Sequence, residues 1–253
     1  MIFPISDLWL GGMILMRVSG FFLLIPFLAN QTIPKRVRGA LAIGFTILLI
    51  PLVEPSVAVP EMGLEWFLIA MQEILIGSLM GFGVRLIFFA VEFASQIIAM
   101  EASLAMTTAL NPLTSSPATA IAPLLFYLTI LFIFILGIDY QIYQSLYRSF
   151  EIKPIGESVL DHLDIKQLVI DCSGIFQLGL KMAAPIVAIA FVINVVFAIL
   201  GKTAPKVNVL MISFPIRISA GLILLTLTFD LIVQYLIVGT QDMGNRILEF
   251  LVQ

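Results

Sequence analysis

Residues 64–95 read LEWFLIAMQEILIGSLMGFGVRLIFFAVEFAS, and this stretch decides the fold class of the chain. Its apolar side chains are interrupted by charges only at Glu65, Glu73, Arg85 and Glu92. A helix that spans a membrane needs about 20 mainly apolar residues. The stretch therefore predicts a membrane-spanning helix. Because it is too long for one straight crossing, it also indicates tilting or bending.

Five further apolar segments lie on either side of this stretch. They cover about residues 8–28, 39–54, 121–143, 174–200 and 209–238, and the second is short for a full span. Hydrophobic residues make up 60% of the 253 residues and charged residues only 11%. A soluble domain has about 25% charged residues, so the composition excludes an ordinary soluble enzyme. The sequence predicts an all-α membrane protein of about six long hydrophobic helices arranged in hairpins.

The connections between these segments differ in charge. The first, residues 30–38, carries three positive charges and no negative ones, and the fifth, residues 202–206, is short and basic. Positively charged connections tend to stay on the cytoplasmic side of a membrane. These two connections therefore predict a shared cytoplasmic side, with both termini on the opposite side.

The fourth connection, residues 144–173, is the only long charged stretch. Near its end, Asp164-Ile-Lys-Gln167 resembles a capping box and predicts a helix that begins there and runs into residues 174–200. At the N-terminus, no basic region or small-residue cleavage site marks a removable signal. We expect the first apolar segment to belong to the mature protein.

Residues able to carry catalysis are scarce. His162 is the only histidine and Cys172 the only cysteine. Neither has the additional ligands of a metal site or the base that activates a nucleophile. We therefore expect no catalytic residue, no metal and no cofactor. The net charge of −3 supplies no basic stripe, so we expect no nucleic-acid partner either.

Six charges lie inside or beside apolar stretches, where each one costs about 2.5–3.5 kcal/mol at a bilayer centre. They are Arg17, Glu73, Arg85, Glu92, Arg217 and Asp230. One interpretation is that they pair across helices or between subunits, or reach out from helix ends. The other is that they form the ion relay of a secondary transporter. Arg85 and Glu92 are seven residues apart, which places them on the same face of a helix. Glu73 and Arg85 share a face less closely.

Gly77 and Gly81 lie four residues apart within the same apolar stretch. No lysine follows them, so they do not form a phosphate-binding loop. Small residues at this spacing allow two membrane helices to approach closely. We interpret the two glycines as helix-packing positions.

The third connection, residues 99–123, has small and hydroxylated residues, prolines at 112, 117 and 123, and no charge after Glu101. Irregular backbone cannot face lipid, because its polar groups would lack partners. A loop that is buried in protein or lines a pore fits this composition, and its apolar residues could block such a pore. A plain external loop fits it equally well.

Several short motifs stand out along the chain. The first part of the chain contributes Arg17, Pro26 and Ile33-Pro-Lys-Arg-Val-Arg38, and the middle contributes Gln72-Glu-Ile-Leu-Ile-Gly77, Gly81-Phe82 and Asn111-Pro112. The most specific motif is Lys202-Thr-Ala-Pro-Lys-Val-Asn208, followed by Phe214-Pro215 and Gly221. Together these motifs resemble the FliR/SctT family, the export-gate subunits of flagellar and virulence type III secretion systems, and the matches follow the family's order from about residue 17 to 225. The run at 33–38 is more similar to the flagellar members.

The resemblance implies a single export-gate subunit over residues 1–253, with a FliP-like part over 1–173 and a FliQ-like hairpin over 174–253. Such a subunit joins several FliP-like and FliQ-like subunits in a helical ring around an export pore. An FlhB-like subunit, unfolded export substrates and membrane lipid are its other expected partners. Its expected location is the bacterial inner membrane, in the export apparatus of the flagellar basal body.

The resemblance also implies that the central loop, about residues 100–120, plugs the pore from one side. The residues that match this plug are Met106, Thr107, Thr108, Ala109, Leu110, Asn111 and Pro112. Family members usually have glycines where Ser95, Ala99 and Ser103 stand, and an Asp-Pro where Asn111-Pro112 stands. These departures reduce backbone freedom and remove a carboxylate from the loop.

We therefore expect a non-enzymatic structural subunit that helps to form and seal a protein-export pore, with Arg17, Glu73, Arg85 and Arg217 fixing subunit contacts. The alternative is a secondary transporter or channel for a small solute. In that case Glu73, Glu92 or Asp230 would relay ions. A membrane enzyme is disfavoured because the chain has no catalytic cluster.

Overall fold

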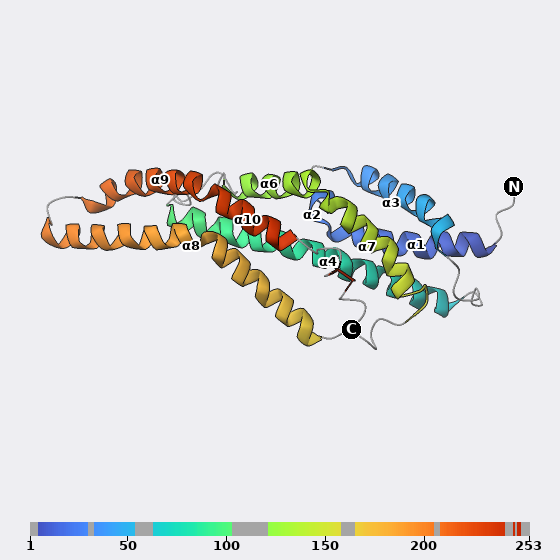
Figure 1. The fold of residues 1–253 in the computed structure, drawn as a ribbon. Coiled ribbons are helices and arrows are strands. Elements are labelled where there is room, and N and C mark those ends of the chain that lie inside the picture. Colours follow the sequence, from blue (N-terminus) through green and yellow to red (C-terminus); the bar gives the residue numbers. More distant parts are fainter. Residues whose placement is uncertain are drawn as a thin grey trace. The chain divides into compact units, whose positions relative to one another are not determined.

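The computed structural model describes residues 5–29, 33–53, 63–102, 121–157, 165–204, 208–240, 245 and 247–248 (Figure 1). Within these residues the regular elements are all helices, which confirms the predicted all-α membrane fold. The apolar stretch at residues 64–95 lies in α4, a continuous helix over Leu64–Glu101. The helix therefore continues six residues beyond the predicted end at 95, through Gln96-Ile-Ile-Ala-Met-Glu101, which contains neither glycine nor proline.

The first two predicted segments are each interrupted near a proline. The segment at 8–28 forms α1 (Ile5–Leu24) and the short α2 (Pro26–Ala29). Proline lacks a backbone N–H and is best tolerated in the first turn, so α2 begins at Pro26. The segment at 39–54 forms α3 (Lys35–Leu49) and a 3-10 turn, η1 (Ile50–Leu52).

Two further segments are bent pairs of helices. The fourth forms α6 (Ile121–Ile135) and α7 (Ile138–Ile152), which are separated at Gly137, where φ is 67°. Only glycine adopts this left-handed conformation at little cost, so it ends one helix and begins another. The sixth forms α9 (Val209–Leu227) and α10 (Phe229–Thr240), which meet at 55°. Bends are therefore found in the fourth and sixth segments, whereas residues 64–95, for which length alone indicated tilting or bending, lie in the continuous helix α4.

Two predicted connections are wrong in part, because helices occupy them. Residues 144–152 belong to α7, whose buried residues include Ile142, Leu146 and Phe150 at intervals of four. This spacing places the three apolar residues on one face of the helix and leaves the charges of this stretch on the other. The charges alone therefore suggested a connection where a half-buried helix lies. Similarly, the basic residues of the first connection lie in the first turn of α3.

The fifth predicted segment forms α8, Ile165–Thr203. Asp164 of the predicted capping box lies outside the described residues. Figure 1 shows a change of direction within α8, and the helix contains Pro185. Proline removes a helical hydrogen bond and clashes with the preceding turn, which bends a helix. After α8 the chain turns back into α9, where the side chain of Asn208 accepts a hydrogen bond from the Met211 N–H at 3.3 Å.

Among the residues that the structure describes, three helices are long and apolar enough to cross a membrane: Asp7–Leu24, Leu64–Glu101 and Cys172–Thr203. The count rises to five if each bent pair, α6 with α7 and α9 with α10, forms one span. Fewer straight spans are found than the six predicted segments because glycine, proline and threonine positions break the apolar runs.

The chain divides into two compact units. Unit 1 comprises residues 1–86, 133–171 and 241–253, and unit 2 comprises residues 87–132 and 172–240. Helix α4 begins in unit 1 and ends in unit 2. Residues 87–132 thus belong with the C-terminal helices of unit 2, and the FliP-like and FliQ-like parts on either side of residue 173 stay a prediction.

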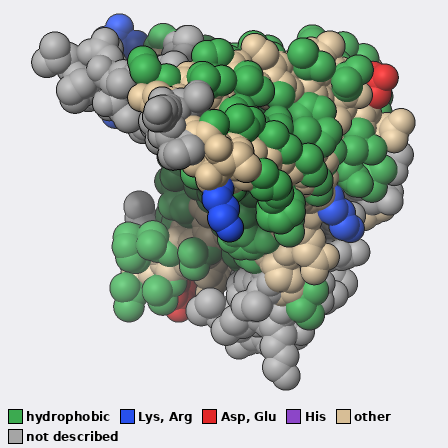
Figure 2. All heavy atoms as spheres, turned by 90° about the vertical axis from the view of Figure 1, so that its left-hand side faces the viewer, with side chains coloured by type: hydrophobic (Ala, Val, Ile, Leu, Met, Phe, Trp, Pro, Cys, Tyr) green, Lys and Arg blue, Asp and Glu red, His purple; other side chains and the backbone are tan. Residues whose placement is uncertain are grey.

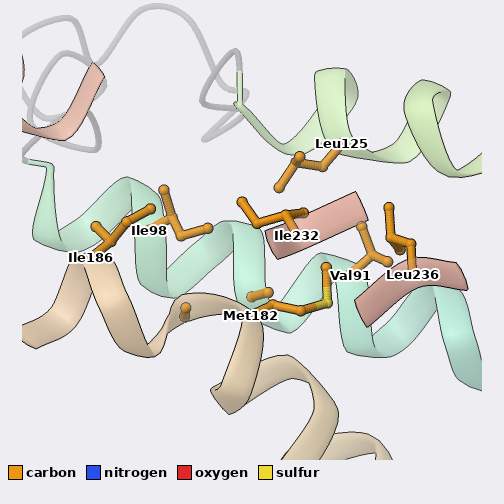
Figure 3. Packing of buried hydrophobic residues seen from close by; sticks show 9 residues of the cluster. Val91, Ile98, Leu125, Met182, Ile186, Ile232 and Leu236 are labelled. Carbon is orange, nitrogen blue, oxygen red and sulfur yellow. The ribbon is translucent and has the colours of Figure 1, made fainter. Parts of the chain in front are cut away.

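Unit 2 has a core to which four helices contribute. Val91, Ala94 and Ile98 come from α4, Leu125 from α6, Met182, Ala183 and Ile186 from α8, and Ile232 and Leu236 from α10. Figure 3 shows these side chains converging, with Met182 among them. Each is at most 2% exposed. This packing holds together helices that are far apart in the sequence.

Unit 1 is held together by α1, which packs against α3 and the first half of α4. An aromatic chain runs from Phe22 of α1 to Phe45 of α3 and on to Tyr143 of α7, with ring centroids 5.2 and 4.9 Å apart. Ring pairs at these separations attract one another beyond their apolar burial. They fix α3 and α7 against α1.

Candidate functional site

Arg17, in α1, is the largest fully buried side chain of the described residues. Its Nε donates a hydrogen bond to Glu73 Oε2 of α4 at 2.6 Å, and both side chains are 0% exposed. The guanidinium carbon lies 4.1 Å from the centre of the Phe150 ring. We call Arg17, Glu73, Ser149, Phe150 and Lys153 the Arg17 cluster. It lies entirely within unit 1.

The same guanidinium caps the C-terminal end of α7. Nη1 donates to the carbonyl oxygen of Ser149 at 2.9 Å and to its hydroxyl at 3.2 Å, and Nη2 donates to the carbonyl oxygen of Lys153 at 2.9 Å. The last carbonyls of a helix lack partners within it, and the helix dipole favours a cation there. Arg17 thus joins α1, α4 and α7 at one point.

Both carboxylate oxygens of Glu73 have partners. Oε2 accepts from Arg17, and Oε1 accepts from the backbone N–H of Gly156 at 3.3 Å. Gly156 follows α7 and has φ of 93°, a conformation that favours glycine. A buried charge is tolerated only when it is paired and hydrogen-bonded. The cluster satisfies this condition as a closed network.

Glycines allow α4 to approach α1 beside this cluster. A Cβ added at Gly77 would collide with the carbonyl oxygen of Arg17, and one at Gly20 with that of Ile74. At Gly81, an added Cβ would lie 2.6 Å from the carbonyl oxygen of Phe21. The two predicted packing glycines therefore lie against the α1 backbone. Their closeness lets Arg17 reach Glu73.

This geometry suits a structural role for Glu73 better than an ion relay. A relay group must exchange its ion with water or with another relay group. Glu73 has no exposed surface, and both its oxygens are occupied by donors from its own chain. Arg17 and Glu73 thus pair across helices of one chain, which is one of the interpretations that the sequence left open. That they also fix subunit contacts stays a prediction.

The other predicted charges lie apart from this cluster. Glu92 on α4 and Asp230 on α10 are exposed, whereas Arg85 on α4 and Arg217 on α9 are half-buried. The Nε atom of Arg217 is buried without a hydrogen-bond partner among the described residues.

The predicted plug, Met106 to Pro112, lies outside the described residues, and so does His162. Cys172 is a half-buried free thiol in α8. Within the described part of the chain, no group of three His, Cys, Asp or Glu side chains could hold a metal ion.

A broad apolar surface is exposed on α8. Only 17% of the most apolar part of its span, within Cys172–Thr203, is buried. Phe191, Val192 and Ile199 are 66%, 58% and 59% exposed. Figure 2 views the side on which α8 turns into α9, and hydrophobic side chains cover most of the described surface there. A patch of this kind needs lipid or another protein against it.

Comparison with known proteins identifies the family. The family described as "Bacterial export proteins, family 1" matches residues 8–243, which is nearly the whole chain. This chain belongs to that family. The match includes the Arg17 cluster, the packing glycines and all six predicted intramembrane charges of this export protein.

Individual relatives cover most of the chain as well. The export protein is 27% identical over 235 residues to the flagellar biosynthetic protein FliR of Escherichia coli (strain K12), covering 91% of this chain and 90% of the relative. It is 22% identical to FliR of Bacillus subtilis (strain 168), covering 87% and 86%. It is also 23% identical to the secretion system apparatus protein SsaT of Salmonella typhimurium, covering 84% of each.

Sequence reasoning did not find the α7 side of the cluster in this export protein. Lys153 contributes a backbone carbonyl, which carries no sequence signal, and Ser149 contributes a backbone carbonyl and a hydroxyl in a stretch that was interpreted as a connection. Phe150 and Gly156 had a weak signal at most, since they lie in a stretch that its charges marked as a connection. The opposite charges of Arg17 and Glu73, each isolated in an apolar helix, were the signal that could have paired them.

Proposed function

We propose that this chain is a non-enzymatic structural subunit of a bacterial flagellar type III export gate in the inner membrane. The family match over residues 8–243, with FliR proteins among the relatives, carries this proposal. SsaT, whose name refers to a secretion system, belongs to the same kind of apparatus and supports the coarser assignment to type III export.

The geometry of the chain supports a structural part in that apparatus. The buried ion pair of the Arg17 cluster joins three helices, and neither charged side chain of the pair is exposed to solvent. In contrast, α8 presents large apolar side chains outward. We infer that this exposed surface packs against FliP-like and FliQ-like subunits, and that an FlhB-like subunit joins the assembly.

The central loop completes the proposal. Residues 106–112 would seal the closed pore against ions and open for unfolded export substrates. The loop is uncharged and rich in small residues, so it can pack tightly around a pore axis without desolvating a charge. The FliP-like and FliQ-like parts of the chain would supply the frame that holds this loop.

Co-expression tests the assembly. The chain is expressed with the FliP-like and FliQ-like proteins encoded beside it, purified and imaged. We expect one large complex containing all three proteins. A stable monomer or dimer that transports a small solute in liposomes would overturn the proposal and support the secondary transporter instead.

A permeability measurement tests the seal. Deleting residues 106–112 should make cells leak small ions, and replacing them by an equally long Gly-Ser segment should do the same, because the apolar side chains are lost while the loop length is kept. Unchanged permeability in both variants, with the complex still assembled, would refute the sealing role.

A further inference from the structure

An open groove of about 400 Å³ lies between α1 and α3 in unit 1. Its described lining consists of Ser19, Phe22 and Leu23 from α1 and Lys35, Arg38, Gly39 and Ala42 from α3. At about 30 Å³ per water molecule, this volume equals roughly thirteen waters. It has room for a phosphate group and the upper part of an acyl chain. Neither the Arg17 cluster nor the proposed pore seal uses this groove.

The groove has a cationic portion. Lys35 and Arg38 line it, and the first turn of α3 contains no acidic residue. Arg38 Nη2 donates to the carbonyl oxygen of Ile33 at 3.2 Å, but its Nε is buried without a hydrogen-bond partner among the described residues. Buried donors of this kind normally have an acceptor. The described lining therefore suits an anionic group.

Apart from Ser19, the rest of the described lining is apolar, and it lies where a membrane span ends. Phe22 and Leu23 belong to the last turn of the candidate span Asp7–Leu24, and Leu23 is 62% exposed. The headgroups of the bilayer lie at the ends of spanning helices. An occupant of this groove would therefore have its negative charge at the headgroup level and its apolar part beside the end of α1.

We propose that the groove binds an anionic phospholipid, with the phosphate at Lys35 and Arg38 and an acyl chain against the exposed side chain of Leu23. Basic pockets beside membrane helices bind anionic headgroups, and each cation near the surface contributes about 1 kcal/mol, or about fivefold. The proposal goes beyond the proposed function and does not depend on it.

Lipid retention tests the charges. The full chain is purified from its membrane complex, reconstituted with either phosphatidylcholine or a phosphatidylcholine–phosphatidylglycerol mixture, and analysed by native mass spectrometry. The wild-type chain should retain phosphatidylglycerol, and Lys35→Gln and Arg38→Gln should each lower its retention about fivefold. Arg36→Gln removes the same charge from an exposed neighbour outside the groove and should leave retention unchanged.

A second pair of variants tests the space itself. Gly39 lines the groove and Gly44 does not, and a Cβ at either position on α3 meets nothing within 4 Å. Gly39→Leu should therefore fill the groove and lower retention, whereas Gly44→Leu should not. Equal retention in Gly39→Leu and the wild type would overturn the proposal, and so would equal losses in Arg36→Gln and Arg38→Gln. Loss of a partner subunit instead of lipid from Gly39→Leu would also overturn it, in favour of a protein occupant.

Discussion

At the scale of single residues, Arg17 is the position on which unit 1 depends most. Arg17→Ala leaves the Glu73 carboxylate buried without its cation and removes the cap on α7. Breaking one side of a buried ion pair costs about 3–5 kcal/mol, so this variant should unfold at a clearly lower temperature in detergent. Arg148→Ala is the matched control, because Arg148 is an exposed arginine of α7, and its effect should stay within about 0.5 kcal/mol.

The pairing itself is tested by a double-mutant cycle. Arg17→Met and Glu73→Met together remove both charges, so the double variant should be less destabilised than the sum of the two single variants. Strict additivity would contradict the ion pair. Even the double variant should be less stable than the wild type, because Met cannot donate hydrogen bonds to the carbonyls of Ser149 and Lys153.

The sequence predicts which residues in this cluster are unusual but not what they contact. Arg17 and Glu73 stand out as charges in apolar helices. Gly77 stands out because Gly81 follows it four residues later, a spacing typical of close helix packing. Arg17 and Glu73 are 56 residues apart in the sequence, and their contact depends on how α1 and α4 cross. No local sequence pattern encodes that crossing. The carbonyls that Arg17 binds belong to the backbone and are invisible at the sequence level.

At the scale of elements, the approach of α4 to α1 depends on Gly77. Gly77→Ala places a Cβ on the Arg17 carbonyl oxygen, and a backbone atom cannot move aside without shifting α1. Overpacking of this kind costs about 1–3 kcal/mol, which exceeds the roughly 0.5–1 kcal/mol that alanine gains in a helix. Gly12→Ala in α1 has the same gain and meets nothing within 4 Å, so it should be neutral or stabilising. Equal thermal stability of the two variants would show that the helices do not approach this closely.

The core of unit 2 allows a second test at this scale. Met182 is 0% exposed among residues of four helices, whereas Met211 in α9 is 72% exposed. Met182→Ala should cost about 2–5 kcal/mol through the cavity that it leaves, while Met211→Ala should stay within about 0.5 kcal/mol. Hydrogen exchange should show the loss in the helices of unit 2. Similar protection in both variants would contradict the core.

At this scale the sequence predicts which segments are helical, but it does not predict where each helix begins and ends. The apolar runs identify the helices because a membrane admits little else, and α9 begins at Val209, where the predicted segment 209–238 begins. The breaks at Gly137 and Thr228 were missed, because a glycine or threonine inside an apolar run is equally compatible with an unbroken membrane helix. The end of α7 was missed because its charges conceal its buried face.

At the scale of the whole molecule, the hydrophobic share of 60% exceeds what two small cores need. Much of the surplus is exposed on α8, where it requires either lipid or protein as a neighbour. The proposed function assigns this surface to sister subunits. Two phenylalanines of α8 separate the alternatives, because Phe191 is 66% exposed and Phe197 only 8%.

A photoreactive benzoyl-phenylalanine at position 191 should therefore cross-link to a FliQ-like or FliP-like subunit in the assembled complex. The same probe at position 197 should give at most links within the chain, since that side chain is buried against its own unit. Both probes replace a phenylalanine in one helix, so differences in insertion or helix propensity are small. If the probe at 191 reached only lipid in a complex that still contains all three proteins, α8 would be a lipid-facing helix. The excess apolar surface would then be a consequence of the bilayer and no longer an argument for assembly.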